Sequence, residues 1–310
     1  CRARSCGASG LIRAAMADFL PPDVRSRLRG LRLVTRRAVG SHGIGLHQSH
    51  SRGAGLEFAQ YRAYEPGDEL RQIDWKLYAR SDKFFVREAE RESPVAIWIL
   101  IDASASMGQS DAARPDYSRL DASKAIAAAI GELAMQQGDR FGLIALGDSG
   151  LRLVPPATGL RQRDRMMLEL LDIAAARTFA SNDQLGPLWE RIGTHDLVIM
   201  LSDCFDNGAV ALVEKLASAG RETLVIEMLT VAERDFPFTG GFRFRDPETG
   251  EELLADGAAL RTEFLARFGA AREALHARLD ATGIRHVAHV LDEAVDLPLR
   301  RLFAAPGTAD

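Results

Sequence analysis

Residues 95–107 read VAIWILIDASASM, an unbroken apolar run that ends at Asp102 and is followed by Ser104 and Ser106. A run of this length with no polar alternation predicts a β-strand that is buried on both faces. Such strands are typical of parallel sheets that helices cover on both sides. The stretch therefore predicts a central strand of an α/β domain, with an acidic side chain at the carboxyl end of that strand.

The sequence downstream alternates between strand-like and helix-like segments. Apolar runs predict further strands over residues 140–146, 151–154, 196–202, 223–229 and 284–291. Apolar residues at helical spacing predict helices over residues 120–137, 163–175, 185–192, 209–219 and 261–282. Residues 242–254 predict a hairpin excursion. The alternation predicts an α/β fold with a mostly parallel, Rossmann-like sheet, helices on both of its faces, and one antiparallel hairpin at residues 140–154 on its edge.

The sequence upstream of the first strand has a different character. Residues 18–37 carry apolar residues at helical spacing and predict a short helix, and residues 38–55 are rich in Gly, Ser and His and predict a loop. Three strand-like segments predict a small β unit at residues 56–64, 73–79 and 84–87. We therefore expect four parts, which are a disordered leader (1–17), an N-terminal helix, loop and β unit (18–93), the α/β domain (94–300) and a tail (301–310).

Composition and charge narrow the class of protein. Lys and Arg number 39 against 43 Asp and Glu, and the resulting net charge of −4 argues against nucleic-acid binding. No apolar run approaches the roughly 20 residues that a membrane-spanning helix needs. The three cysteines (Cys1, Cys6 and Cys204) fit no zinc-binding spacing and suit a reducing compartment. We therefore expect a cytoplasmic protein without a transmembrane segment.

A second acidic side chain follows a later strand of the same predicted sheet. The apolar run at residues 197–201 leads into a serine and then into Asp203. Ligands of doubly wound sheets bind beyond the carboxyl ends of the strands, so Asp203 would meet the 102–106 loop there. Carboxylate and hydroxyl oxygens are hard ligands that suit Mg²⁺, with Mn²⁺ as the alternative ion. The candidate metal ligands are Asp102, Ser104, Ser106 and Asp203. The other interpretation is that the aspartates are strand-end caps and the serines are turn hydroxyls.

Two stretches resemble known families. The sequence DASAS at residues 102–106 resembles the metal-ion-dependent adhesion motif (MIDAS), Asp-x-Ser-x-Ser, of von Willebrand factor A domains. The segments SRGAGLEF (51–58), YRAYEPGD (61–68), RQIDW (71–75) and AR (79–80) resemble the bacterial family called domain of unknown function 58, and this likeness extends over roughly residues 20–300. The resemblance implies a von Willebrand A-like fold. It also implies association with MoxR-type AAA+ ATPases and with other von Willebrand A proteins, as an adaptor in protein maturation or remodelling.

The resemblance also assigns candidate roles to single residues. The 102–106 loop matches the first metal motif, and Asp203 matches the later aspartate of the family. The threonine that A domains carry before their third helix has two candidates here, Thr178 and Ser181, and neither lies in the usual Gly-Thr-Asp context. Asp203 is followed by Cys204 rather than by the common glycine. These departures leave the completion of the metal site open.

Three functions remain open at this point. The first is a non-enzymatic interaction module, in which the metal at the sheet edge binds an acidic side chain of a partner protein. The second is a metal-dependent hydrolase that uses Asp102 and Asp203 with a metal-bound water. A hydrolase needs a general base beside the metal, and the sequence offers no convincing His or Glu for that role. The third is a structural scaffold whose metal site has decayed.

Overall fold

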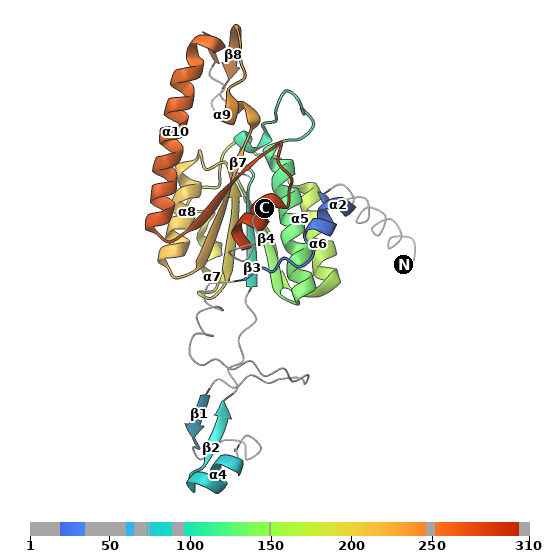
Figure 1. Cartoon of the computed structure of the whole chain (residues 1–310), viewed down its shortest axis with the longest axis vertical. Coiled ribbons are helices and arrows are strands. Elements are labelled where there is room, and N and C mark those ends of the chain that lie inside the picture. Colours follow the sequence, from blue (N-terminus) through green and yellow to red (C-terminus); the bar gives the residue numbers. More distant parts are fainter. Residues whose placement is uncertain are drawn as a thin grey trace. The chain divides into compact units, whose positions relative to one another are not determined.

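The computed structural model describes residues 19–34, 60–64, 73, 75–88, 96–148, 150–245 and 252–303 of the 310-residue chain. The chain divides into two compact units. The larger unit comprises residues 1–40 and 95–310, and the smaller comprises residues 41–94. Figure 1 shows the helices and strands of each unit. The predicted boundary between residues 93 and 94 lies next to the boundary between the units.

A six-stranded sheet forms the centre of the larger unit (Figure 1). Its strand order is β10-β7-β6-β3-β4-β5, and every neighbouring pair is parallel except β4 and β5, which are antiparallel. The strands are β3 (Ala96–Asp102), β4 (Arg140–Gly147), β5 (Gly150–Ala157), β6 (Leu197–Ser202), β7 (Glu222–Leu229) and β10 (Arg285–Val290). This arrangement confirms the predicted von Willebrand A-like fold class, including its antiparallel edge hairpin.

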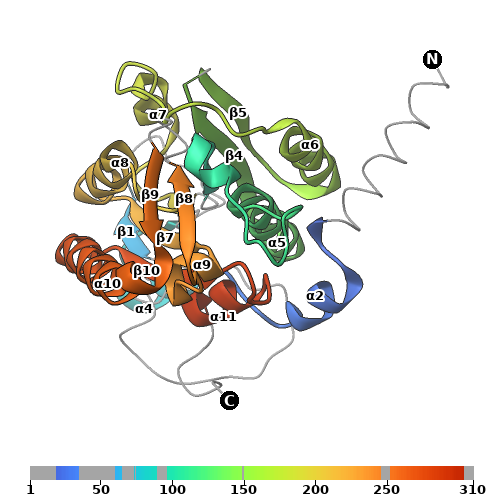
Figure 2. The ribbon, with the colours of Figure 1, turned by 90° about the horizontal axis from the view of Figure 1, so that it is seen from above.

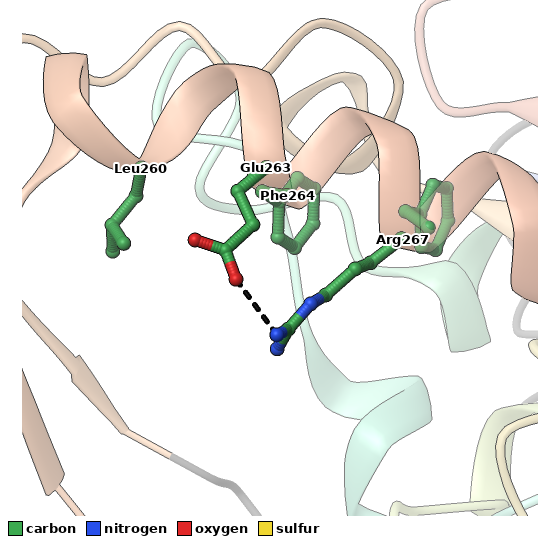
Figure 3. A pocket seen from close by; sticks show the side chains of 5 residues that line it. Leu260, Glu263, Phe264 and Arg267 are labelled. Atoms are coloured by element: carbon green, nitrogen blue, oxygen red, sulfur yellow. Dashed lines mark ion pairs between the residues drawn. The ribbon is translucent and has the colours of Figure 1, made fainter.

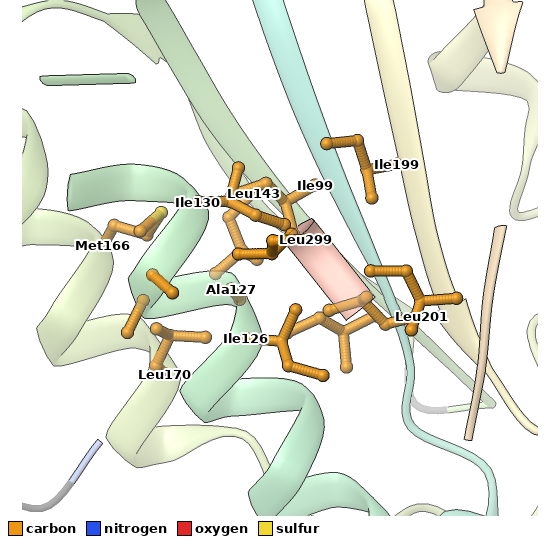
Figure 4. Close-up of a cluster of buried hydrophobic side chains, with 14 of the residues drawn as sticks. Ile99, Ile126, Ala127, Ile130, Leu143, Met166, Leu170, Ile199, Leu201 and Leu299 are labelled. Carbon is orange, nitrogen blue, oxygen red and sulfur yellow. The ribbon is translucent and has the colours of Figure 1, made fainter. Parts of the chain in front are cut away.

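Helices cover both faces of this sheet (Figure 2). One face packs against α2 (Pro22–Arg27), α5 (Arg119–Gln137), α6 (Gly159–Asp172) and α11 (Leu297–Phe303). The other face packs against α7 (Gly186–Arg191), α8 (Asn207–Ser218) and the carboxyl end of α10 (Gly257–Ala281). Successive side chains of a strand point to opposite faces. Ile99 of β3 therefore joins the first core, which Figure 4 shows together with Ile126 of α5, and Trp98 joins the second core.

Helix α5 begins and ends at clear sequence signals. Ser118 and Asp121 form a capping box, in which the Ser118 hydroxyl accepts a hydrogen bond from the Asp121 backbone N–H at 3.2 Å. Gly138 ends the helix with a φ of 79°, a left-handed conformation that glycine adopts without steric cost. The first residue of the helix is therefore Arg119, which lies beside the carboxyl end of β3.

The N-terminal helix belongs with the larger unit rather than with the small β unit to which the sequence assigned it. Within the described residues 19–34, Pro22–Arg27 forms helix α2, and Gly30 follows it in a left-handed conformation with a φ of 83°. The buried side chains of Leu20, Val24 and Leu28 lie in the first core cluster. The apolar residues at helical spacing in the described part of this segment thus pack against the sheet domain.

The predicted strand at residues 73–79 is wrong, because residues Trp75–Ser81 form helix α4 of the smaller unit. Alternating apolar residues suggested a strand there. In the helix, Trp75 and Tyr78 lie on one face with their ring centroids 6.1 Å apart, and Tyr78 stacks on Phe84 at 4.4 Å. The flanking prediction of strands is confirmed, since β1 (Gln60–Ala63) pairs with β2 (Phe85–Glu88) in antiparallel orientation.

Three short elements complete the larger unit. The predicted hairpin is present as β8 (Gly241–Arg245) and β9 (Glu252–Asp256), and it leads directly into α10. The sequence did not predict the 3-10 helix η2 (Ala105–Gly108) or the helix α9 (Val231–Asp235). In the part of the chain that the structure describes, no helix combines the length and the apolar character needed to cross a bilayer.

Candidate functional site

The structure brings the four candidate ligands together at one edge of the sheet. Asp102 is the last residue of β3, and Asp203 follows β6 directly. These strands are parallel neighbours, with Ile101 paired to Leu201, so both carboxylates emerge at the same edge. All four candidate residues are buried, and Asp102 and Asp203 are 0% and 1% exposed. The hydroxyl oxygens of the two serines, Ser104 and Ser106, lie 3.1 Å apart.

Asp102 is held by uncharged donors. One carboxylate oxygen accepts the backbone N–H of Ser104 at 2.9 Å, and the other accepts the hydroxyl of Ser202 at 2.6 Å. The pKa of Asp102 is raised to about 6, mainly because the carboxyl is buried; the Ser202 hydrogen bond opposes this shift and the nearby Asp203 carboxylate adds to it. The charge of ionised Asp102 is therefore poorly compensated by its surroundings, which favours a cation beside it.

Asp203 has a cationic partner, Arg119, that the sequence did not reveal. The Arg119 side chain is 0% exposed, and its Nη1 donates to Asp203 at 2.9 Å and to the backbone carbonyl of Ser106 at 2.9 Å. Its Nη2 forms an ion pair with Glu233 of α9. Burial raises the pKa of Asp203, whereas the charge of Arg119 lowers it. The guanidinium thus joins β6, the 102–106 loop, α5 and α9.

A weak sequence signal for Arg119 exists. Ala122, Ser123 and Ile126 stand three, four and seven positions after Arg119, and all three are buried. That spacing places Arg119 on the inner face of α5, where an unpaired arginine would be costly. A helix predicted to start at Leu120 left this residue outside the pattern. Its acidic partners could not be identified, because they lie 84 and 114 positions along the chain.

Asp111 and Thr230 fix the helix that carries Glu233. The Asp111 carboxylate accepts the backbone N–H groups of Val231 and Ala232, each at 3.0 Å, across 120 and 121 positions of sequence. Thr230 and Glu233 form a capping box at the same helix start. These contacts place an acidic side chain of α9 against Arg119.

The two hydroxyl candidates of the 177–183 loop lie outside this buried group. Thr178 and Ser181 are both exposed. Ser181 donates its hydroxyl to the side-chain oxygen of Gln184 at 3.2 Å, and the Thr178 carbonyl accepts the backbone N–H of Asp148 at 3.0 Å. The segment nevertheless contacts the 102–106 loop, because the Ala176 N–H donates to the Ala103 carbonyl, and the choice between the two hydroxyls stays a prediction.

Cys204 occupies the position where A domains commonly have glycine. Its φ is 60°, in the left-handed region that favours glycine, and its backbone N–H donates to the Ser202 hydroxyl at 2.9 Å. Burial raises the pKa of its thiol, which disfavours a reactive thiolate. The turn keeps its shape without glycine and leads to Phe205, whose side chain is exposed.

Aromatic side chains extend from this turn along α10. The Phe205 ring lies 6.4 Å from that of Phe268, which stacks on Phe264 at 5.6 Å. Leu260 and these α10 rings line a hollow of about 250 Å³, with an ion pair of 2.8 Å between Glu263 and Arg267 at its side (Figure 3). An apolar surface therefore adjoins the acidic edge of the sheet.

The oxygen atoms of the four candidate residues fit a divalent cation, provided that Asp203 is available beside Arg119. Two carboxylates and two hydroxyls supply hard oxygen atoms, and Asp102 is without a cationic partner among the described residues. Asp203 would have to be shared with, or released by, Arg119. The described residues contain no group of three or more His, Cys, Asp and Glu arranged to hold a metal. An ion at this edge would therefore depend on the hydroxyls of Ser104 and Ser106.

Several known proteins are similar to this chain. Uncharacterized proteins of Mycobacterium tuberculosis and Mycobacterium bovis are 28% identical over 268 residues, which is 84% of this chain and 82% of theirs. Among solved structures, BatB from Bacteroides thetaiotaomicron has a TM-score of 0.35 and 15% identity, over 61% of this chain and 98% of that one. The SpRpn10 VWA domain has a TM-score of 0.39 and 13% identity, over 70% and 99%. The family described as "Protein of unknown function DUF58" matches residues 60–274, more than half of the chain, and the chain therefore belongs to the DUF58 family.

Proposed function

We propose that this chain is a non-enzymatic protein-interaction module that binds its partner at the carboxyl edge of the sheet. Asp102, Ser104, Ser106 and Asp203 would hold Mg²⁺, or Mn²⁺ in its place, at that edge. The carrying observation is the burial of two carboxylates side by side at the ends of neighbouring strands, with one of them hydrogen-bonded only to uncharged donors. Such an arrangement is electrostatically costly without a further cation.

The proposed ion would supply an open coordination position for a carboxylate of the partner. The chain's own residues orient the ligands. The Ser104 N–H and the Ser202 hydroxyl fix the two oxygens of Asp102, and the Phe205 N–H donates to Asp203 at 3.1 Å. Preorganised ligands reduce the ordering that binding requires. The aromatic surface that starts at Phe205 would then contact apolar side chains of the partner beside the metal-bound acid.

The proposed partner is a MoxR-type AAA+ ATPase, together with other von Willebrand A proteins, in protein maturation or remodelling in the cytoplasm. This part of the proposal is supported by membership of the DUF58 family and by the association that the resemblance implies. The chain would act as an adaptor, and the nucleotide hydrolysis would belong to the ATPase.

Binding of a purified MoxR-type ATPase to the immobilised chain tests this function. We expect binding in Mg²⁺ that is lost with chelator and lost in Asp102→Ala. Asp116→Ala is the matched control, because Asp116 is an exposed acid of the loop that follows η2. Equal binding by wild type, Asp102→Ala and Asp116→Ala would contradict a metal-bridged contact.

One observation favours the scaffold with a decayed site as a second candidate. Arg119 supplies a positive charge at Asp203, which is the charge that a metal would otherwise provide. In that case the chain would bind partners equally well with and without divalent cations. The hydrolase receives less support, because the carboxylate of Glu233 is already engaged by Arg119 and by the Thr230 N–H.

A further inference from the structure

Three acids and one arginine meet at the edge of the sheet, and the single positive charge of the arginine is shared between two of the acids. Arg119 pairs with Asp203 and with Glu233. The contacts of Asp102 come instead from the Ser104 N–H and the Ser202 hydroxyl, which carry no charge. The described part of the site therefore retains one buried carboxylate without a counter-ion, next to an acid that already has one.

Arg119 contacts two of the four residues that would hold the metal. Its Nη1 lies 2.9 Å from Asp203 and 2.9 Å from the carbonyl oxygen of Ser106. A cation that takes Asp203 as a ligand must either approach this guanidinium or displace it. Like charges at such a distance in a buried site repel strongly. Arg119 and a divalent cation therefore compete for the same carboxylate.

The arginine can leave Asp203 and keep another partner. Glu233 binds its Nη2, and the Glu233 side chain is 13% exposed. The Nε of Arg119 is buried and has no hydrogen-bond partner among the described residues, so the present contacts do not satisfy the whole guanidinium. The ring of Phe205 lies 5.3 Å from the guanidinium carbon, and this aromatic side chain is half exposed. The pocket of Arg119 therefore has an acid on its α9 side and a ring that faces solvent.

We infer that Arg119 is a built-in counter-ion that competes with the divalent cation for Asp203 and thereby sets the metal affinity of the site. This inference rests on the proposed metal-dependent function. Without metal, the Arg119–Asp203 pair stabilises the domain. With metal, the ion takes Asp102, Ser104, Ser106 and Asp203, and Arg119 keeps Glu233. Wild-type affinity is weak because each binding event breaks a buried ion pair.

Isothermal titration of the full chain with MgCl2 and with MnCl2 tests the inference. Two variants are used. The first is Arg119→Gln. The second adds Glu233→Gln, so that one of the two acids that lose their arginine partner is also made neutral. The double variant keeps the test possible where the single variant does not fold. Arg114→Gln is the matched control, because Arg114 is an exposed arginine in the loop between η2 and α5, with its guanidinium carbon 3.7 Å from the Tyr117 ring centroid. Circular dichroism establishes which variants are folded.

We expect folded Arg119→Gln variants to bind the ions on the order of tenfold or more tightly than wild type and Arg114→Gln do. Adding Asp102→Ala to these variants should abolish the binding. Equal affinity in wild type and in the folded Arg119 variants would overturn the role of Arg119 and leave the metal site standing. Absence of binding in every folded variant would overturn the metal site itself, and this inference with it.

Discussion

The guanidinium of Arg119 lies 2.9 Å from the carboxylate of Asp203, and neither side chain reaches solvent. This pair links the first residue of α5 to the carboxyl end of β6. Removing one member of a buried ion pair is far more costly than removing an exposed charge, because the partner remains desolvated and unpaired. The pair therefore makes Arg119 important for stability as well as for the charge of the candidate site.

Arg119→Met should destabilise the domain by about 3–5 kcal/mol, because the buried Asp203 and the partly buried Glu233 would lose their counter-ion. Urea unfolding followed by circular dichroism measures this change. Arg114→Met, which removes an exposed arginine, should change the unfolding free energy by less than about 0.5 kcal/mol. Similar unfolding free energies for the two variants would show that the Arg119 pair contributes little.

Asp111→Ala should weaken α9 by about 1–2 kcal/mol, because Asp111 caps the first backbone N–H groups of that helix. Hydrogen exchange at Val231 and Ala232 measures the loss directly. Exchange at these two amides should accelerate in Asp111→Ala and stay at the wild-type rate in Asp116→Ala. Unchanged protection in Asp111→Ala would mean that α9 is held by its own capping box alone.

His289 should make the fold sensitive to acid. Its side chain is fully buried, neither ring nitrogen has a hydrogen-bond partner among the described residues, and burial lowers its pKa from 6.5 to about 4. The unfolded chain therefore binds this proton more readily than the folded chain does. The stability contributed by neutral His289 is fully present above pH 6.5 and is lost as the pH falls toward 4, by about 3 kcal/mol in total.

His289→Leu tests this dependence through urea unfolding at pH 7 and near pH 4. The difference in unfolding free energy between the two pH values should be smaller in His289→Leu than in wild type. His195→Leu is the control, because His195 is exposed on a loop of the same unit. The prediction is wrong when both substitutions leave the pH dependence of wild type unchanged.

Much of the fold follows from apolar patterning alone. The continuous runs that become β3 and β6 could only be buried between two layers of helices, so their place in the sheet was predictable. Residues 75–81 show the limit of this approach. Alternating apolar residues there suggested a strand, whereas aromatic contacts such as that of Tyr78 with Phe84 stabilise a helix.

The candidate site was predictable only in part. Asp102 and Asp203 follow apolar strands, and this local signal placed them at one edge of the sheet. The role of Arg119 depends on ion pairs with Asp203 and Glu233, which lie far from it in sequence. Glu233 also lies on α9, a helix of five residues that is too short to give a clear periodic pattern. The spacing of residues within one segment does not predict pairs between distant segments. The charge balance of the site therefore emerged only from the three-dimensional structure.

A crystal structure of the chain grown with Mn²⁺ would show whether the sheet edge holds a metal, because anomalous scattering locates the ion. We expect an anomalous peak coordinated by Asp102, Asp203 and the hydroxyls of Ser104 and Ser106, with Arg119 turned away from Asp203 and still paired with Glu233. A structure grown with saturating Mn²⁺ that shows Arg119 still paired with Asp203, and no anomalous peak at this edge of the sheet, would contradict the proposed metal site.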